Sequence, residues 1–333
     1  PKLSAEKVPR LPDRESWDFG LIRKAYPVGS PGRYSAVVFA SRGCPFTCTF
    51  CKPLTGKEIR ARETESIISE IKYLKKRWNV QYVRFFDEVF IGSKFRIRAL
   101  CEAMIEENLN IFWWCQTQVR LVDEDLLKVM KKAGCIEIAY GVESGSDVVL
   151  EDMKKGINVE IIRDVLEATD RAGIRISLNL LAGTPAETVD TLKDTRDFLV
   201  TLNHINWANV PTIEFVVPLP GTELFDTAVA EGLIENPEVF VVEALAKMDK
   251  YSKSINMTKM SSEEFISTVK RFNREISRDF YAKHPFRFLL YLFGAEHLRL
   301  DLIFRNFSLK QVVPLLDALF WGTIGKHMHY FPK

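Results

Sequence analysis

The amino-acid sequence lacks the features that mark a membrane or secreted protein. No apolar run among its 333 residues approaches the roughly 20 residues that a membrane-spanning helix needs. The N-terminus has no charged segment followed by an apolar one, as a secretion signal would have, so we expect a cytoplasmic protein. The chain begins with Pro1 rather than Met, which leads us to expect a longer product with a further segment upstream.

Charge of one sign is also not in excess. The chain has 46 Lys and Arg residues against 44 Asp and Glu residues, a formal net charge of +2. A protein that binds nucleic acid through a broad basic field would carry far more positive charge, so we expect no nucleic-acid partner. The hydrophobic share of 47% and the charged share of 27% are those of an ordinary globular protein of one large domain or two smaller ones.

The six cysteines are unevenly distributed. Cys44, Cys48 and Cys51 lie within eight residues, whereas the other three cysteines are scattered singly. A structural zinc site needs four ligands and usually a second CxxC pair, which this sequence lacks. Three thiolates on one loop suit a [4Fe–4S] cluster with one iron left open to another ligand. The alternative is three buried loop cysteines without a metal.

The scattered cysteines have the pattern of packing residues. Cys101 lies in an apolar helix stripe, and Cys135 begins a predicted strand, so we expect both to pack as small hydrophobic groups. Cys115 lies on a predicted strand and faces either the core or the lumen of a barrel.

Short apolar runs alternate with helix-period stretches from about residue 35 to residue 217. The predicted strands are Ser35–Ala40, Val80–Phe86, Ile111–Thr117, Ile136–Tyr140, Ile174–Leu181 and Thr212–Val217. We expect Thr64 and Asp123 to cap the helices that follow them. Such continuously apolar strands suit a parallel sheet covered by helices, either doubly wound or a barrel. Six units are two short of a full barrel, which favours an α/β fold, a partial (βα)6 TIM-like barrel with a helical C-terminal extension.

Three regions are expected along the chain. Residues 1–33 contain several prolines and form a lead-in or linker, residues 34–225 form the barrel, and residues 226–333 form a mostly helical region. The aromatic and basic segments Phe286–Phe293 and Val312–Trp321 are too short to span a bilayer. We expect them to cover the open side of the barrel; the alternative is peripheral contact with a membrane or with a large apolar substrate.

The string SRGCPFTCTFC (Ser41–Cys51) follows the first predicted strand. Its CxxxCxxC spacing, with Phe50 before the last cysteine, resembles the radical S-adenosylmethionine (SAM) superfamily, in particular the subgroup whose members usually carry a cobalamin-binding domain upstream. The resemblance extends over about residues 35–225. It implies a [4Fe–4S] cluster held by Cys44, Cys48 and Cys51, whose open iron chelates SAM. It also implies that residues 1–33 follow a cobalamin-binding domain outside this chain.

The resemblance also assigns SAM contacts to residues at the strand ends. These are Phe50, Asp87, Glu88, Gln118, Arg120, Glu143, Lys155, Gly183 and Val217. Asp87 and Glu88 depart from the two glycines of the family's Gly-Gly-Glu-like segment and offer carboxylates to the methionyl ammonium; the alternative is a solvated acidic strand end.

For the other polar assignments, alternatives also stay open. Glu143 accepts hydrogen bonds from ribose hydroxyls or from the ammonium group of SAM. Either Lys155 or its neighbour Lys154 binds the SAM carboxylate. Arg120 suits a carboxylate as well, or it pairs with Asp123 or Glu124.

The function that follows from the resemblance is reductive cleavage of SAM to methionine and a 5′-deoxyadenosyl radical, for cobalamin-dependent methyl transfer to an unactivated carbon. The alternatives are cobalamin-linked cyclisation or rearrangement, a cobalamin-independent radical SAM modification enzyme, and a metal-binding scaffold without turnover. The expected partners are a small-molecule, natural-product, lipid or tetrapyrrole-like substrate and an electron donor such as flavodoxin or ferredoxin. The sequence has no DxHxxG, the usual cobalamin lower-ligand signature.

Overall fold

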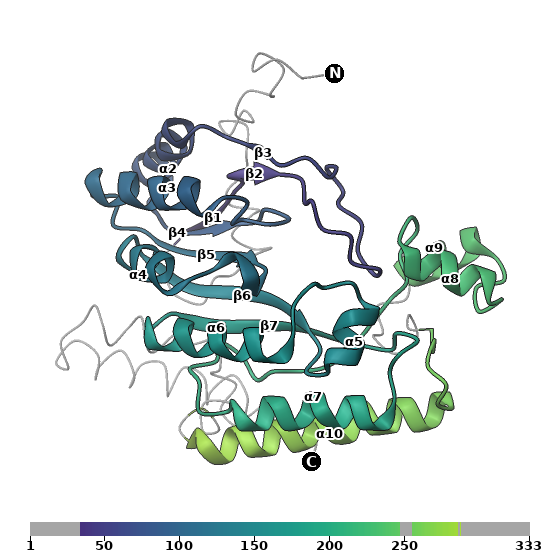
Figure 1. The fold of residues 1–333 in the computed structure, drawn as a ribbon. Helices are drawn as coiled ribbons and strands as arrows, with labels where there is room; N and C mark the ends of the chain where they lie inside the picture. The colour runs from purple at the N-terminus through teal and green to yellow at the C-terminus, as the bar shows by residue number, and fades with distance from the viewer. Residues whose placement is uncertain (1–33, 247–254, 286, 288–333) are drawn as a thin grey trace, which may run out of the picture. The chain divides into compact units, whose positions relative to one another are not determined.

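The computed structural model describes residues 34–246, 255–285 and 287 (Figure 1). The expectations for residues 1–33 and for the aromatic segments after residue 287 lie outside the described residues. The described residues from Ser35 onward belong to one compact unit.

A sheet of six strands forms the centre of this unit. Its spatial order is β1 (Tyr34–Val38), β4 (Val80–Phe85), β5 (Phe112–Thr117), β6 (Cys135–Glu143), β7 (Arg175–Ala182) and β8 (Glu214–Phe215). Neighbouring strands from β4 to β8 are parallel. The strands follow one another in chain order without the reversal of a doubly wound sheet, so the prediction of a partial barrel is confirmed.

Helices connect the strands and continue after the last one (Figure 1). They are α2 (Thr64–Trp78), α3 (Lys94–Glu106), the 3-10 helix η3 (Val119–Leu121), α4 (Glu124–Lys132), α5 (Asp147–Asp152), α6 (Val159–Arg171), α7 (Val189–Thr201), α8 (Glu223–Ala230), α9 (Pro237–Ala246) and α10 (Ser262–Lys283). Among the described residues, no helix is long and apolar enough to cross a bilayer.

The two predicted helix caps have different outcomes. Asp123 caps α4, because its carboxylate accepts a hydrogen bond from the backbone N–H of Leu126 at 2.9 Å. The prediction for Thr64 is wrong by one position: Thr64 is the first residue inside α2, and Glu63 is the N-cap without a side-chain hydrogen bond. A residue with helical backbone angles cannot hold the extended conformation that an N-cap needs.

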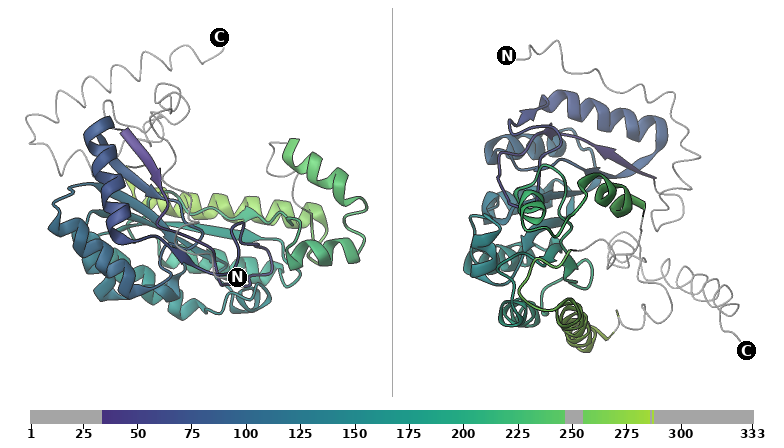
Figure 2. Two further views of the ribbon diagram at one scale, coloured as in Figure 1. Left: turned by 90° about the horizontal axis from the view of Figure 1, so that it is seen from above. Right: turned by 90° about the vertical axis from the view of Figure 1, so that its right-hand side faces the viewer.

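The two faces of the sheet differ because strand side chains alternate between them. Figure 2 shows α2, α3, α4 and α6 along one face. The residues that this face buries completely include Val83, Phe85, Trp113, Cys115, Ile138 and Ile176. Cys115 therefore faces the core rather than the lumen. Cys101 and Cys135 are likewise fully buried, as expected of packing residues.

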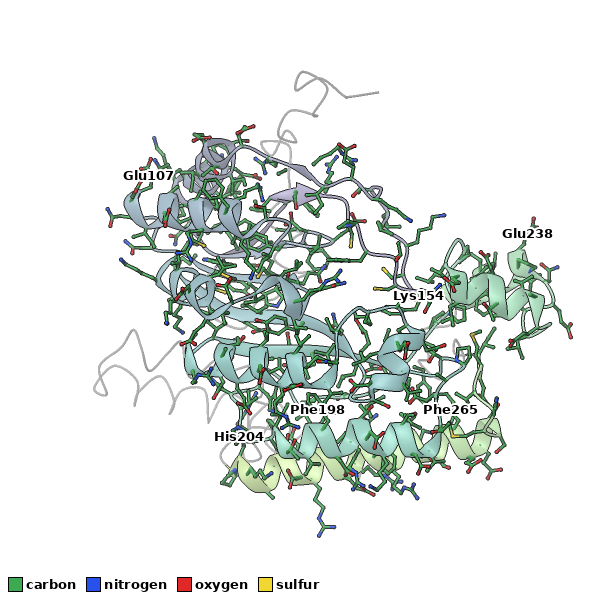
Figure 3. The ribbon with its side chains drawn as sticks, in the orientation of Figure 1. Glu107, Lys154, Phe198, His204, Glu238 and Phe265 are labelled. Carbon is green, nitrogen blue, oxygen red and sulfur yellow. The ribbon has the colours of Figure 1, made fainter. Side chains whose placement is uncertain are left out.

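Lys154 and Phe265 lie on the side of the molecule where the strands end, whereas Glu107 and His204 lie toward the opposite side (Figure 3). Phe265 belongs to α10, which packs along α7 (Figure 1). An ion pair between Arg196 and Glu275 at 2.9 Å joins these two helices. In the region expected to be mostly helical, the described helices thus pack with the barrel.

Candidate functional site

The three clustered cysteines lie on a loop whose two ends pair with each other in a short antiparallel ladder. The strands of this ladder are β2 (Ser41–Arg42) and β3 (Arg60–Ala61). Inside it, the backbone N–H of Cys44 donates to the carbonyl of Gly56 at 3.1 Å. Gly43 has a φ of +97°, and a Cβ there would lie 2.0 Å from the carbonyl oxygen of Glu58. The close return of the loop therefore requires glycine at this position.

Two carboxylates at the end of β4 hold this loop. Asp87 is 1% exposed and accepts hydrogen bonds from the backbone N–H groups of Ala40 and Ser41 and from the Ser41 hydroxyl. Burial raises the pKa of Asp87, and these hydrogen bonds oppose that rise. The alternative of a solvated acidic strand end is therefore wrong for Asp87.

Glu88 holds the loop from the other side. Its carboxylate accepts from the backbone N–H of Gly43 at 2.9 Å and from the N–H and hydroxyl of Thr55 at 3.1 and 2.5 Å. Partial burial tends to raise the pKa of Glu88, but the Thr55 and Gly43 hydrogen bonds outweigh it and bring this pKa below its usual value. Glu88 thus joins the beginning of the loop to its far arm.

The middle of the cysteine loop is fixed by backbone hydrogen bonds on both sides. The N–H of Thr49 donates to the carbonyl of Met153 at 3.2 Å, and its carbonyl accepts from the N–H of Leu224 at 2.9 Å. Next to it, Phe50 packs against the apolar cluster that Leu224 and Phe225 of α8 help to form. The residue before the last cysteine thus anchors the loop to α8.

The thiols themselves differ in exposure. Cys48 is buried, Cys44 is partly buried and Cys51 is exposed. Burial raises the pKa of each thiol, and the neighbouring Cys48 and Cys44 raise the pKa of Cys51 further, so the three groups lie within electrostatic reach of one another. Among the described side chains, no three His, Cys, Asp or Glu are close enough to hold a metal ion as they stand. The ligand type and number fit a cluster, and its binding would require the thiols to converge and lose their protons.

A buried ion pair lies beside the loop at the end of β6. Lys155 Nζ is 3.0 Å from Glu143 Oε1, and these side chains are 3% and 7% exposed. Burial raises the pKa of Glu143, and Lys155 opposes this rise. Lys155 Nζ also lies 5.6 Å from the centre of the Phe50 ring. The ion pair and the cysteine loop therefore form one site.

The local backbone explains why Glu143 faces inward. Glu143 has a φ of +70°, unusual for a residue other than glycine, where the pairing of β6 with β7 shifts register. A Cβ at Gly141 would lie 2.8 Å from Glu143 Oε1, so glycine leaves room for the carboxylate. Lys154 is exposed and pairs with Glu223 of α8 at 2.6 Å. Of the two neighbouring lysines, it is therefore Lys155 that enters the site.

Polar atoms without partners mark the ends of β5 and β7. The side-chain oxygens Gln118 Oε1, Thr117 Oγ1 and Thr184 Oγ1 are buried and have no hydrogen-bond partner. Because leaving such a group unsatisfied costs about 1–3 kcal/mol, these atoms suit contact with a polar ligand or with water. The hydrophobic and charge patterns of the sequence carry no signal for Thr117 or Thr184.

Arg120 lies on the same edge of the sheet and is exposed. Its guanidinium carbon is 4.2 Å from the centre of the Phe46 ring, inside the cysteine loop. The alternative pairing of Arg120 is not what the structure shows, because Asp123 pairs with Lys94 at 2.7 Å and Glu124 with Lys128 at 3.4 Å.

The two remaining predicted contacts lie in the loops after β7 and β8. Gly183 has a φ of +112°, and its Cβ position is 3.1 Å from the ring of Phe265 on α10. Val217 is partly buried after β8. Glu187, in the same loop as Gly183, is 2% exposed, and burial raises its pKa to about 7. Glu187 was not among the predicted contacts, since charge patterning does not reveal which loop carboxylate becomes buried.

An open half-barrel with a braced three-cysteine loop after its first strand defines the radical SAM class of protein. Residues 38–199 match the model of the Radical SAM superfamily, and this part of the chain is a radical SAM domain.

Two curated proteins with similar sequences are a methyltransferase and a cyclase. An uncharacterized methyltransferase of Pyrococcus horikoshii is 28% identical over 255 residues, which are 75% of this chain and 54% of the relative. The anaerobic magnesium-protoporphyrin IX monomethyl ester cyclase of Rubrivivax gelatinosus is 28% identical over 219 residues, 64% of this chain and 38% of the cyclase. The chain thus spans about half, or less, of the length of these relatives.

The fold has similar solved structures. The radical SAM methyltransferase TsrM from Kitasatospora setae, determined with cobalamin and a [4Fe–4S] cluster bound, superposes with a TM-score of 0.53. The match covers 60% of this chain and 40% of TsrM at 19% sequence identity. At this identity the likeness concerns the fold alone.

Proposed function

We propose that this chain is the SAM-cleaving part of an enzyme that transfers a methyl group to an unactivated carbon with the help of cobalamin. The observation that carries the proposal is the braced cysteine loop beside the buried Glu143–Lys155 pair. A reduced [4Fe–4S] cluster bound by Cys44, Cys48 and Cys51 would supply one electron to the sulfonium of SAM, giving methionine and a 5′-deoxyadenosyl radical.

The residues around the loop have distinct tasks in this proposal. Lys155 binds the carboxylate of SAM, and Glu143 binds its ammonium or its ribose hydroxyls. When Glu143 binds the ammonium, each member of the ion pair exchanges one partner of opposite charge for another, which keeps both buried charges neutralised throughout binding. Phe50 and Phe225 shield the site with apolar surface, while the unpartnered oxygens of Gln118 and Thr184 are available to polar groups of the ligand.

The similarity to a methyltransferase supports methyl transfer as the reaction. Because the chain spans only part of that relative, methyl transfer by this chain is a proposal. In line with the resemblance of the cysteine motif, we place cobalamin on a segment outside this chain. Cyclisation of a tetrapyrrole-like or other small-molecule substrate is the second candidate, favoured by the cyclase relative.

An electron donor such as flavodoxin or ferredoxin completes the proposal. Leu54 of the cysteine loop is 95% exposed, and the basic residues Lys52 and Lys57 of the same loop and Arg42 at its beginning are exposed as well. An exposed apolar residue on a loop that carries exposed basic side chains suits the acidic surface of a small redox protein. A cytoplasmic location, where SAM and reduced donors are supplied, belongs to the same proposal.

The test is product analysis after anaerobic reconstitution with iron and sulfide, reduction, and addition of SAM. The proposal predicts 5′-deoxyadenosine, and with cobalamin and a methyl acceptor also S-adenosylhomocysteine. The triple variant Cys44→Ala, Cys48→Ala, Cys51→Ala should lose the cluster absorbance and the products, while the control Cys135→Ala should keep both. A cluster-replete protein that forms neither product would refute the proposal.

A further inference from the structure

Three side chains form a stack on the face of the sheet opposite the helices. The guanidinium carbon of Arg84 lies 4.7 Å from the centre of the Trp114 ring and 5.6 Å from that of Phe86. The two rings are 5.9 Å apart and tilted by 31°. We call Arg84, Phe86 and Trp114 the lumen stack, because they lie on the concave face that a half-barrel turns away from its helices.

The strand register produces this stack. Arg84 of β4 pairs with Trp114 of β5, and Phe86 follows two positions after Arg84 on the same face. The alternate residues Val83 and Phe85 are fully buried on the other face. The sheet therefore fixes the position of the lumen stack from below.

The lumen stack is open to solvent at Phe86, whereas Trp114 is only 7% exposed. Phe86 is 45% exposed, and Phe39, which directly follows the neighbouring strand β1, is 43% exposed. Large aromatic side chains exposed next to one another on a folded protein are costly unless they serve binding. Phe86 immediately precedes Asp87 and Glu88, which brace the cysteine loop, so this surface continues directly into the candidate SAM site.

Arg84 contributes a charge that the described protein leaves uncompensated. Its contacts are the two rings, and it has no ion pair, whereas Arg175 on the same face is neutralised by Glu137 at 3.0 Å. Stacking occupies the flat face of a guanidinium and leaves its N–H groups free at the edge. Those donors match the two oxygens of a carboxylate in a bidentate arrangement.

We propose that the lumen stack binds the substrate, and that this substrate is a planar conjugated molecule with a carboxylate group. The ring system packs on Phe86 and on the outer face of the Arg84 guanidinium, and the carboxylate accepts hydrogen bonds from Arg84. This inference rests on the proposed function, because a molecule bound at the lumen stack is a substrate only if SAM is cleaved at the neighbouring site. Arg84 then determines specificity for an acid over its ester.

The test measures binding of a planar diacid, protoporphyrin IX, and of its uncharged dimethyl ester to the unreduced protein, by quenching of tryptophan fluorescence. Removing a charge-assisted hydrogen-bonded contact corresponds to about 1.5–3 kcal/mol, or about 10- to 150-fold in Kd. We expect Arg84→Gln to weaken diacid binding by at least about 10-fold, to the level of the ester. Arg84→Lys, which keeps the charge without the planar fork, should fall between them.

The matched control is Arg77→Gln. Arg77 lies over the ring of Trp78 at 4.4 Å, at the end of α2 on the other side of the sheet, so it is the same kind of contact outside the proposed site. Its removal should leave diacid binding unchanged. Equal diacid affinity of the wild type and Arg84→Gln, equal affinity for acid and ester, or no diacid binding at all would overturn the proposal.

Because binding is measured without reduction, this test is separate from the test of SAM cleavage. Diacid binding that depends on Arg84, in a protein that forms no 5′-deoxyadenosine, would refute the proposed function and leave the binding site standing. Product formation without such binding would do the reverse. Thermal unfolding of each variant establishes that a change in affinity does not come from unfolding.

Discussion

The strand ends after β4 and after β6 both carry carboxylates beside the cysteine loop, but these carboxylates have different partners. After β4, the oxygens of Asp87 and Glu88 accept from backbone N–H groups and hydroxyls at both ends of the loop. After β6, Glu143 faces a single ammonium group, that of Lys155. The carboxylates after β4 each accept several hydrogen bonds, whereas the carboxylate after β6 has one charged contact among the described residues.

This difference indicates that the two strand ends have different tasks, one in holding the cysteine loop and the other in binding a ligand. Backbone N–H groups cannot leave, so carboxylates that satisfy them stabilise the conformation of the loop. An ion pair between two side chains can exchange one member for a ligand of the same charge at little cost, provided that both charges remain paired. We infer that the β4 end holds the loop and that the β6 end receives SAM.

The largest effect is expected from Asp87→Ala, which tests the β4 end. The substitution leaves two backbone N–H groups and a hydroxyl without their acceptor, so the free energy of unfolding should fall by about 4 kcal/mol. Iron content after reconstitution should fall with it. The control Asp123→Ala removes an exposed helix cap and should cost about 1 kcal/mol without changing iron content. Normal iron loading of Asp87→Ala would show that Asp87 is not needed for the loop.

The next effect is expected from Lys155→Met, which tests the β6 end. Loss of the ammonium should weaken SAM binding by about 100-fold, that is by about 3 kcal/mol, at unchanged iron content. The double variant Glu143→Gln, Lys155→Met should recover stability, because it leaves no unpaired buried charge, but it should not recover SAM affinity. Lys154→Met is the control and should bind SAM normally. Equal effects of the two lysine variants on SAM affinity would remove the distinction between them.

A third carboxylate extends the comparison to the loop after β7. Burial raises the pKa of Glu187 from 4.5 to about 7, so the stability that its neutral form gives is lost as the pH rises from about 4.5 through about 7. Between about pH 5 and about pH 7.5, the wild type should lose about 2 kcal/mol of unfolding free energy relative to Glu187→Gln. Denaturant titrations at both pH values measure this difference, and parallel pH profiles would contradict the buried state of Glu187.

The smallest effect concerns the outer surface of the cysteine loop. Lys52→Glu, Lys57→Glu should lower the rate at which reduced flavodoxin reduces the reconstituted protein by a few-fold at low salt, with the difference disappearing as salt screens the charges. Lys128→Glu on α4, exposed and distant from the loop, is the control. A rate that the loop variant leaves unchanged at low salt would place the donor elsewhere.

The strands and the cysteine loop could be predicted because their patterns are local. Five apolar runs lie within a few residues of the observed strands. β8 is shorter than its predicted run at both ends, because Pro218 has no N–H to continue the ladder and because the Asn273 side chain binds the backbone N–H and carbonyl of Ile213. The partners of Asp87 and the stacking of Arg84 on Trp114 could not be predicted. Both depend on the register between segments 30 or more residues apart, which a single sequence does not reveal.

The site residues show the same division. The sequence favours Lys155 as a SAM contact but leaves its neighbour Lys154 as the alternative, because two adjacent lysines look alike in a sequence. The structure distinguishes them by the turn after α5, where Lys154 has a φ of +54° and pairs at the surface, whereas Lys155 is buried beside Phe50. Thr117 and Thr184 are candidate ligand contacts only because the structure leaves their buried side-chain oxygens without a hydrogen-bond partner.

We propose that three thiolates on the braced loop hold a four-iron cluster with one iron open to SAM. Electron paramagnetic resonance of the reduced, reconstituted protein before and after addition of SAM tests this proposal most directly. We expect a signal that is absent from the triple Cys44→Ala, Cys48→Ala, Cys51→Ala variant and that changes when SAM binds. A cluster signal that survives the triple substitution, or one that SAM leaves unaltered, would contradict it.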